Sequence, residues 1–181
     1  MRIYMAGPLF TTAETLFNAE LARELRHNGH FVFLPQDFEQ NVEFDPRAVF
    51  LHDVGGIDWC QLVLANMDGP DQDSGTCWEL GYAYAKDKYT MTYRTDFRRG
   101  KEAVNLMMTE SANVNLTFKV QDSIINIASR IDAEIRARFE KSPTHRGRLQ
   151  ADQFGGFDVV SDPYEPPRGK FADVLIRTSD K

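Results

Sequence analysis

The chain has 181 residues, a formal net charge of −6 and a pI near 5.2. This length suits one domain with a sizeable core, and the acidic balance argues against a nucleic-acid backbone or an anionic membrane as the main partner. Two cysteines, Cys60 and Cys77, are too few for a disulfide framework, and no apolar run approaches the roughly 20 residues that span a bilayer. We therefore expect a cytoplasmic protein that binds a small ligand and keeps both thiols in its core.

The chain begins with a strand, a turn and a helix. An apolar strand over residues 2–6 runs into Gly7–Pro8, where glycine lets the backbone come close to a ligand. A helix follows from a cap at Thr11 or Thr12 to the stop signal Asn28–Gly29, and a second strand covers 30–34. This β-α-β order predicts a right-handed crossover and parallel strands.

The same alternation continues along the chain. The further predicted elements are a surface loop over 36–46, a helix over 47–60 that Gly55–Gly56 weakens, a strand over 61–66, a helix capped by Asp73 or Ser74, a strand over 89–93, a helical turn over 105–108, a strand over 114–120 and a helix over 124–139. These elements predict an α/β, Rossmann-like three-layer sandwich with a five-stranded, mainly parallel sheet.

The C-terminal part of the chain differs from the rest. Residues 141–181 hold four of the eight prolines and one apolar run, at 174–176. We expect residues 1–140 to form the α/β domain, and 141–181 to form an irregular extension that packs on the body or on a neighbouring subunit. Disorder of part of this extension is the alternative.

The motifs of several enzyme classes are missing. The loop after the first strand, Ala6–Phe10, matches neither the dinucleotide-binding fingerprint nor a P-loop. The aspartates at 68, 71 and 73 lack the spacing of a calcium loop, and the four histidines lack that of a metal site. No serine or cysteine triad is indicated. We expect neither a cofactor nor a bound metal.

Carboxylates are the remaining candidates for chemistry. The apolar strand around Leu62–Ala65 ends in an acidic loop and a helix, and ligands of open parallel sheets bind beyond such strand ends. The candidates are Glu79, Asp73, Asp53 and Asp58. Two facing carboxyl groups suit retaining glycosyl transfer. Alternatively, Asp73 only caps the helix, Glu79 pairs with Lys86 on the surface, and Asp53 is solvated.

An ordered set of motifs over about residues 1–120 resembles the nucleoside 2-deoxyribosyltransferases. The motifs are Ile3-Tyr4, Ala6-Gly7, Phe10, Ala65-Asn66-Met67-Asp68-Gly69, Asp73-Ser74-Gly75-Thr76, Glu79-Leu80-Gly81-Tyr82-Ala83 and Asn105-Leu106-Met107. The resemblance implies a flavodoxin-like sheet and a homo-oligomer whose active site is completed by the neighbouring subunit. It also implies that the protein binds 2′-deoxynucleosides and free nucleobases.

The resemblance implies a role for each matching residue. Glu79 is the nucleophile, Tyr4 orients it, and Asp73 and Asp53 contact the base, with one of them exchanging its proton. Asn105 and Met107 reach the sugar from the adjacent subunit. Two further residues are expected at the ligand, Gly7 by close backbone approach and Phe10 as a wall against water, although Phe10 fits an ordinary core position equally well.

The expected activity is transfer of a 2-deoxyribosyl group between bases in nucleoside salvage, through a covalent glycosyl-enzyme intermediate. One alternative is hydrolysis of 2′-deoxynucleoside 5′-monophosphates, which requires a phosphate site such as a helix N-terminus after Phe10 or Asp73. A second alternative is a nucleoside-binding module without catalysis. Binding alone does not require Glu79, which argues against that reading.

Overall fold

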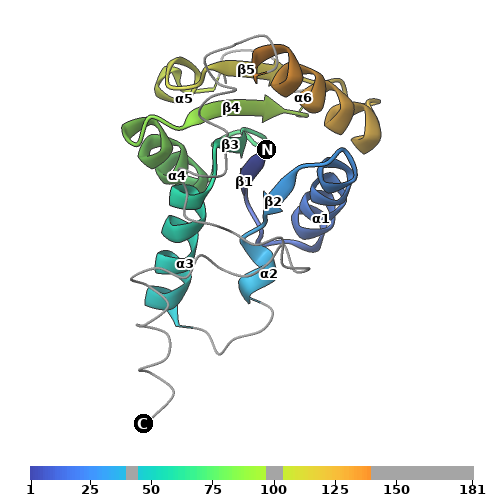
Figure 1. The fold of residues 1–181 in the computed structure, drawn as a ribbon. Coiled ribbons are helices and arrows are strands. Elements are labelled where there is room, and N and C mark those ends of the chain that lie inside the picture. The colour runs from blue at the N-terminus through green and yellow to red at the C-terminus, as the bar shows by residue number, and fades with distance from the viewer. Residues whose placement is uncertain (40–44, 97–103, 140–181) are drawn as a thin grey trace.

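The computed structural model describes residues 1–39, 45–96 and 104–139 (Figure 1). The predicted extension over 141–181 lies outside these residues. Within the described ranges, no helix has both the length and the hydropathy that a membrane span requires.

A five-stranded parallel sheet forms the middle layer. Its strands are β1 (Arg2–Ala6), β2 (Phe31–Phe33), β3 (Leu62–Asn66), β4 (Tyr89–Arg94) and β5 (Val114–Thr117). They lie in the order β2-β1-β3-β4-β5, and every neighbouring pair is parallel. The predicted α/β class and five strands are confirmed, and the sheet is parallel throughout.

Helices connect the strands and cover both faces of the sheet (Figure 1). They are α1 (Thr12–His27), α2 (Gln36–Glu39), α3 (Pro46–Trp59), α4 (Ser74–Ala85), α5 (Leu106–Glu110) and α6 (Ile124–Phe139). The structure resolves two capping alternatives. Thr11 caps α1 in a capping box with Glu14, and Asp73 caps α4.

Three predictions about local structure were wrong. The short helix α2 lies within the predicted loop 36–46, because the amides of Asp37 and Phe38 bond back to the carbonyls of Leu34 and Pro35. The fifth strand ends at Thr117 rather than at residue 120. Cys77 is partly exposed, so only Cys60 is a core thiol.

Strand alternation assigns each side chain to one of two cores. Ile3 and Met5 point into the core that includes α1 and α6, whereas Tyr4 and Ala6 point into the core on the side of α3 and α4. The hydroxyl of Tyr4 is thereby on the same side of the sheet as the helix that carries Glu79.

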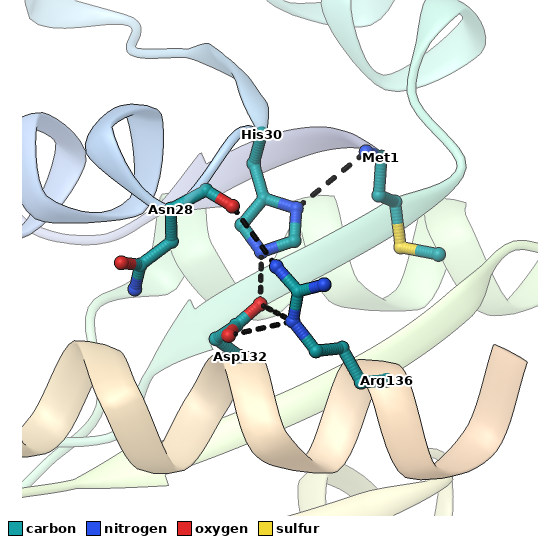
Figure 2. Close-up of polar contacts among 5 residues, drawn as sticks. All are labelled: Met1, Asn28, His30, Asp132 and Arg136. Carbon is teal, nitrogen blue, oxygen red and sulfur yellow. Dashed lines mark hydrogen bonds and ion pairs between the residues drawn. The ribbon is translucent and has the colours of Figure 1, made fainter. Parts of the chain in front are cut away.

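A polar cluster fastens α6 to the start of β2 and the end of α1 (Figure 2). Asp132 Oδ1 lies 2.9 Å from Nε2 of the buried His30, and the Arg136 guanidinium bonds both the Asp132 carboxylate and the Asn28 carbonyl oxygen. Burial lowers the pKa of His30. Burial opposes ionisation of Asp132, but hydrogen bonds from Arg136 and His30 outweigh it and lower the pKa of Asp132.

Gly56 lets α3 approach the sheet closely. A Cβ at this position would lie 2.6–2.8 Å from three ring atoms of Phe33, and the Phe33 ring stacks on Tyr4 with 5.2 Å between centroids. The predicted weakness at Gly55–Gly56 does not interrupt the helix, which runs unbroken from 46 to 59. Gly56 therefore lowers the helix propensity of α3, but no larger residue fits against Phe33.

We predict that Gly56→Ala lowers the free energy of unfolding by about 1–3 kcal/mol, because the methyl group overpacks against Phe33. Gly55→Ala is the matched control, since its Cβ would meet no atom within 4 Å. It should raise stability by roughly 0.5–1 kcal/mol through helix propensity. Urea unfolding of both variants makes the comparison, and equal effects would contradict the packing argument.

Candidate active site

A hydrogen bond across the sheet–helix interface defines the candidate site. The Tyr4 hydroxyl donates to Glu79 Oε1. Tyr4 is fully buried on β1, and Glu79 is partly buried near the middle of α4. Because Tyr4 is stacked on Phe33 and Glu79 is on a regular helix, both partners are held by packed elements rather than by loops.

The surroundings of Glu79 disfavour its charge. Burial is the main cause that raises the pKa of Glu79 to about 8, and the negative charges of Asp53 and Asp73 raise it further. The hydrogen bond from Tyr4 acts in the opposite direction by stabilising the carboxylate. Burial and the charges of Glu79 and Asp53 raise the pKa of Tyr4, so the phenol remains a donor.

Asp73 is at the start of α4 and has a structural contact as well as a charge. Its Oδ2 accepts bonds from the Thr76 amide at 2.7 Å and the Thr76 hydroxyl at 2.9 Å. A Cβ on Gly75 would lie 3.1 Å from that same oxygen, so glycine gives the carboxylate room. Asp73 therefore caps α4, as predicted, and its negative charge also acts on Glu79.

Asp53 projects from α3, and its charge also acts on Glu79 and Tyr4. Asp53 Oδ1 lies 3.5 Å from Nδ1 of His52. Asp58, the fourth candidate carboxylate, instead pairs on the surface with Lys86 at 3.2 Å and accepts from the Tyr82 hydroxyl. The alternative that Glu79 pairs with Lys86 was wrong, because Lys86 is bound to Asp58.

The loop between β1 and α1 lies at the carboxyl ends of β1 and β3. A Cβ on Gly7 would lie 3.3 Å from Asn66 Cβ, so the ends of β1 and β3 approach closely there. Phe10 is 77% exposed, which rules out the core alternative and leaves its predicted role at the ligand untested.

Two buried amides that we did not predict bind this loop and the helix that follows it. The Asn18 amide donates to the Pro8 carbonyl at 2.9 Å, and the Gln36 amide donates to the Thr15 carbonyl at 2.9 Å. Asn18 interrupts the apolar face that Leu21 and Leu25 continue on α1, and a polar residue at such a position is the signal that could have identified it.

Asp68, in the loop after β3, binds the segment that follows β4. Its carboxylate accepts from the Thr95 amide and hydroxyl, both at 2.6 Å, and from the Asp96 amide at 2.7 Å. The loop after β3 is thus tied to the segment after β4.

Asn105 and Met107 lie at the start of α5. The Asn105 side-chain oxygen caps α5 by accepting from the Met107 amide at 2.9 Å, and the Met107 side chain is 65% exposed. Within the described ranges, neither residue has a hydrogen bond to Glu79. Their predicted place at a neighbour's sugar site remains a prediction.

The arrangement suits carboxylate chemistry. Burial raises the pKa of Cys60 to about 12, so this thiol is not a nucleophile. In the parts of the chain that the structure describes, no group of three or more histidine, cysteine or acidic side chains could hold a metal ion. The Tyr4-bound Glu79 and the two aspartates Asp53 and Asp73 can provide a nucleophile, a proton exchanger and stabilisation of positive charge.

The chain matches a known protein family over most of its length. Residues 3–126 match the family model described as nucleoside 2-deoxyribosyltransferase. No curated protein sequence matches the chain.

Several solved structures share the fold. A conserved protein from Enterococcus faecalis V583 is 24% identical, with a TM-score of 0.60 over 73% of this chain and 97% of that one. A 2-deoxyribosyltransferase from Bacillus psychrosaccharolyticus is 27% identical, with a TM-score of 0.58 over 71% and 90%. A CMP N-glycosidase from Clostridium botulinum is 19% identical, with a TM-score of 0.53 over 74% and 99%.

The raised pKa of Glu79 predicts how stability depends on pH. The folded protein holds this proton up to about pH 8, whereas the unfolded chain releases it near 4.5. Between these values the folded state binds more protons, so stability falls as pH rises, by at most about 1.4 kcal/mol per pH unit. Glu79→Gln should remove this part of the slope.

Urea unfolding at pH 5, 7 and 9 measures this difference. Asp58→Asn is the control, because this carboxylate pairs on the surface with Lys86 and should leave the slope attributable to Glu79 unchanged. Parallel pH profiles for the wild type and Glu79→Gln would show that Glu79 is not the titrating group.

Proposed function

Because the chain belongs to the nucleoside 2-deoxyribosyltransferase family, we propose that it transfers the 2-deoxyribosyl group of a 2′-deoxynucleoside to another nucleobase through a covalent ester on Glu79. Members of this family are enzymes that bind nucleosides and nucleobases. The observation that carries the proposal is the hydrogen bond from the buried Tyr4 hydroxyl to Glu79, beside the charges of Asp53 and Asp73.

In the first half-reaction, Glu79 passes its proton to Asp53 or Asp73, and its carboxylate attacks C1′ as the bond from C1′ to the base nitrogen breaks. The electron pair leaves with the base, which takes a proton from Asp53 or Asp73. The transition state carries positive charge on the sugar ring, and the three carboxyl groups around it favour that charge. The hydrogen bond from Tyr4 occupies Glu79 Oε1, so Oε2 is the oxygen available for attack on C1′.

The environment that raises the pKa of Glu79 also favours ester formation. A carboxylate that burial and two negative neighbours destabilise loses that repulsion when it becomes a neutral ester. In the second half-reaction, an incoming base attacks C1′, gives its proton to the carboxylate that protonated the first base, and releases Glu79. Two inversions at C1′ retain the β configuration.

Carboxylates already bind the N-termini of α1 and α4, and this favours nucleosides over 5′-monophosphates as substrates. At the start of α1, the Glu14 carboxylate accepts from the amides of Phe10 and Thr11 at 3.0 and 2.8 Å. At the start of α4, Asp73 accepts from the Thr76 amide. Both termini that could attract a phosphate already hold a carboxylate, which would repel it.

We also propose that a neighbouring subunit completes the site. Asn105 and Met107 are exposed on α5, which contacts α4, the helix that carries Glu79. The Leu106 and Met107 side chains are 67% and 65% exposed, an apolar pair that a second copy of the chain could cover. In the oligomer, the Asn105 amide binds the sugar hydroxyl of the adjacent site.

Incubation with thymidine and adenine tests the proposed reaction, with products separated by chromatography. We expect deoxyadenosine from the wild type and at least a roughly 1,000-fold loss in Glu79→Ala, because the nucleophile is gone. Asp58→Asn, which alters a surface carboxylate, should stay near wild-type activity.

Three outcomes would contradict parts of this proposal. Near-normal turnover in Glu79→Ala would remove Glu79 as the nucleophile. Free base and deoxyribose phosphate from a deoxynucleoside monophosphate, without transfer from thymidine, would identify the hydrolase. A wild type that is silent in both assays but binds nucleosides would be a binding module.

Mixing of two inactive variants tests the shared site. Glu79→Gln lacks the nucleophile, and Asn105→Ser keeps a capping oxygen for α5 while it shortens the reach of the side chain. If subunits exchange residues, mixed oligomers of the two variants recover part of the wild-type activity, because some sites receive an intact copy of each residue. Absence of recovery in oligomers shown to be mixed would place Asn105 outside the neighbour's site.

A further inference from the structure

His52 has its ring fixed by aromatic neighbours. It stacks on Phe38 with 3.8 Å between ring centroids and an angle of 13° between the planes. Its centroid is 4.6 Å from that of Phe33, the same ring that stacks on Tyr4. The His52 side chain is only 13% exposed, so its orientation is set by packing from β2 and α2.

One nitrogen of this ring faces Asp53. His52 Nδ1 is buried and forms no hydrogen bond within the described residues, and Asp53 Oδ1 lies 3.5 Å away. This distance is slightly longer than an N–H···O bond, and bonds at active sites often shorten when substrate binds. Consecutive helix residues do not normally face each other, so the aromatic neighbours of His52 account for the contact.

We propose that His52 is a positioning residue that holds the Asp53 carboxyl group for proton exchange with the base. This inference rests on the proposed function. The protonated His52 Nδ1 donates to one oxygen of Asp53, and the other oxygen gives a proton to the leaving base, whose ring nitrogen keeps the electron pair of the broken bond. The same oxygen takes the proton of the incoming base in the second half-reaction.

The contacts of the two aspartates assign this role to Asp53 rather than to Asp73. Asp73 caps α4, and its Oδ2 already accepts hydrogen bonds from the amide and the hydroxyl of Thr76. Asp53 has the His52 ring as its facing partner, and its charge acts on both Tyr4 and Glu79. An oxygen held by a rigid imidazole keeps its geometry through both half-reactions, which is what repeated proton exchange requires.

His52→Phe is the decisive variant, because it keeps an aromatic ring against Phe38 and Phe33 and removes Nδ1. With thymidine as donor, we expect kcat/KM to fall about tenfold or more, within the range that positioned acid–base groups contribute. With 5-fluoro-2′-deoxyuridine the loss should be clearly smaller, since the more acidic base leaves with less help from a proton. A structural role would slow both donors equally.

A double-mutant cycle separates coupling from general damage. Asp53→Asn removes the proton exchanger, so adding His52→Phe to it should cost little more. Losses that multiply in the double variant, or equal losses with both donors, would overturn the proposal. His52→Gln, which retains an N–H donor, should recover part of the activity lost in His52→Phe.

An NMR measurement keeps this inference distinct from the proposed function. The ¹⁵N shifts of His52 report which ring nitrogen carries the proton, and we expect a protonated Nδ1 that responds to Asp53→Asn but not to Asp73→Asn. If the wild type transfers no deoxyribose, the proposed function fails in that assay. If Nδ1 is unprotonated or insensitive to Asp53, the positioning role fails whatever the activity.

Discussion

The hydrogen bond from Tyr4 to Glu79 is the interaction on which the rest of the site depends. It joins the strand β1, near the middle of the sheet, to α4, and it forms only because strand alternation turns Tyr4 towards that helix. Phe33 supports Tyr4 by stacking, and Gly56 leaves the room that Phe33 needs. A single polar contact thus requires a strand, a ring and a glycine on three different elements.

The same contact opposes a strong electrostatic penalty. Burial and two neighbouring carboxylates disfavour the charge on Glu79, while one phenol hydroxyl favours it. A protein selected for stability alone would not place three acidic groups together, so the cluster lowers stability in return for reactivity. The proposed ester, which is neutral, would relieve this repulsion during each catalytic cycle.

Much of the fold could be predicted because it depends on local patterns. Apolar alternation, the Asn28–Gly29 stop signal and cap residues located every strand and all helices except α2. The partner of Lys86 could not be predicted, because Asp58 and Glu79 lie on different helices whose packing decides between them. The surroundings of His52 were missed for the same reason, since α2, β2 and α3 must meet before the ring has neighbours.

The cluster around Asp132 has a consequence for the order in which the chain can fold during synthesis. His30 and Asp132 are 102 residues apart, so the bond between them forms only after most of the described chain has left the ribosome (Figure 2). Until then, the apolar face of α1 that includes Leu21 and Leu25 lacks the cover that α6 provides. Until α6 (Ile124–Phe139) has been synthesised, the nascent chain therefore carries this exposed apolar surface, a state in which chaperones protect growing proteins.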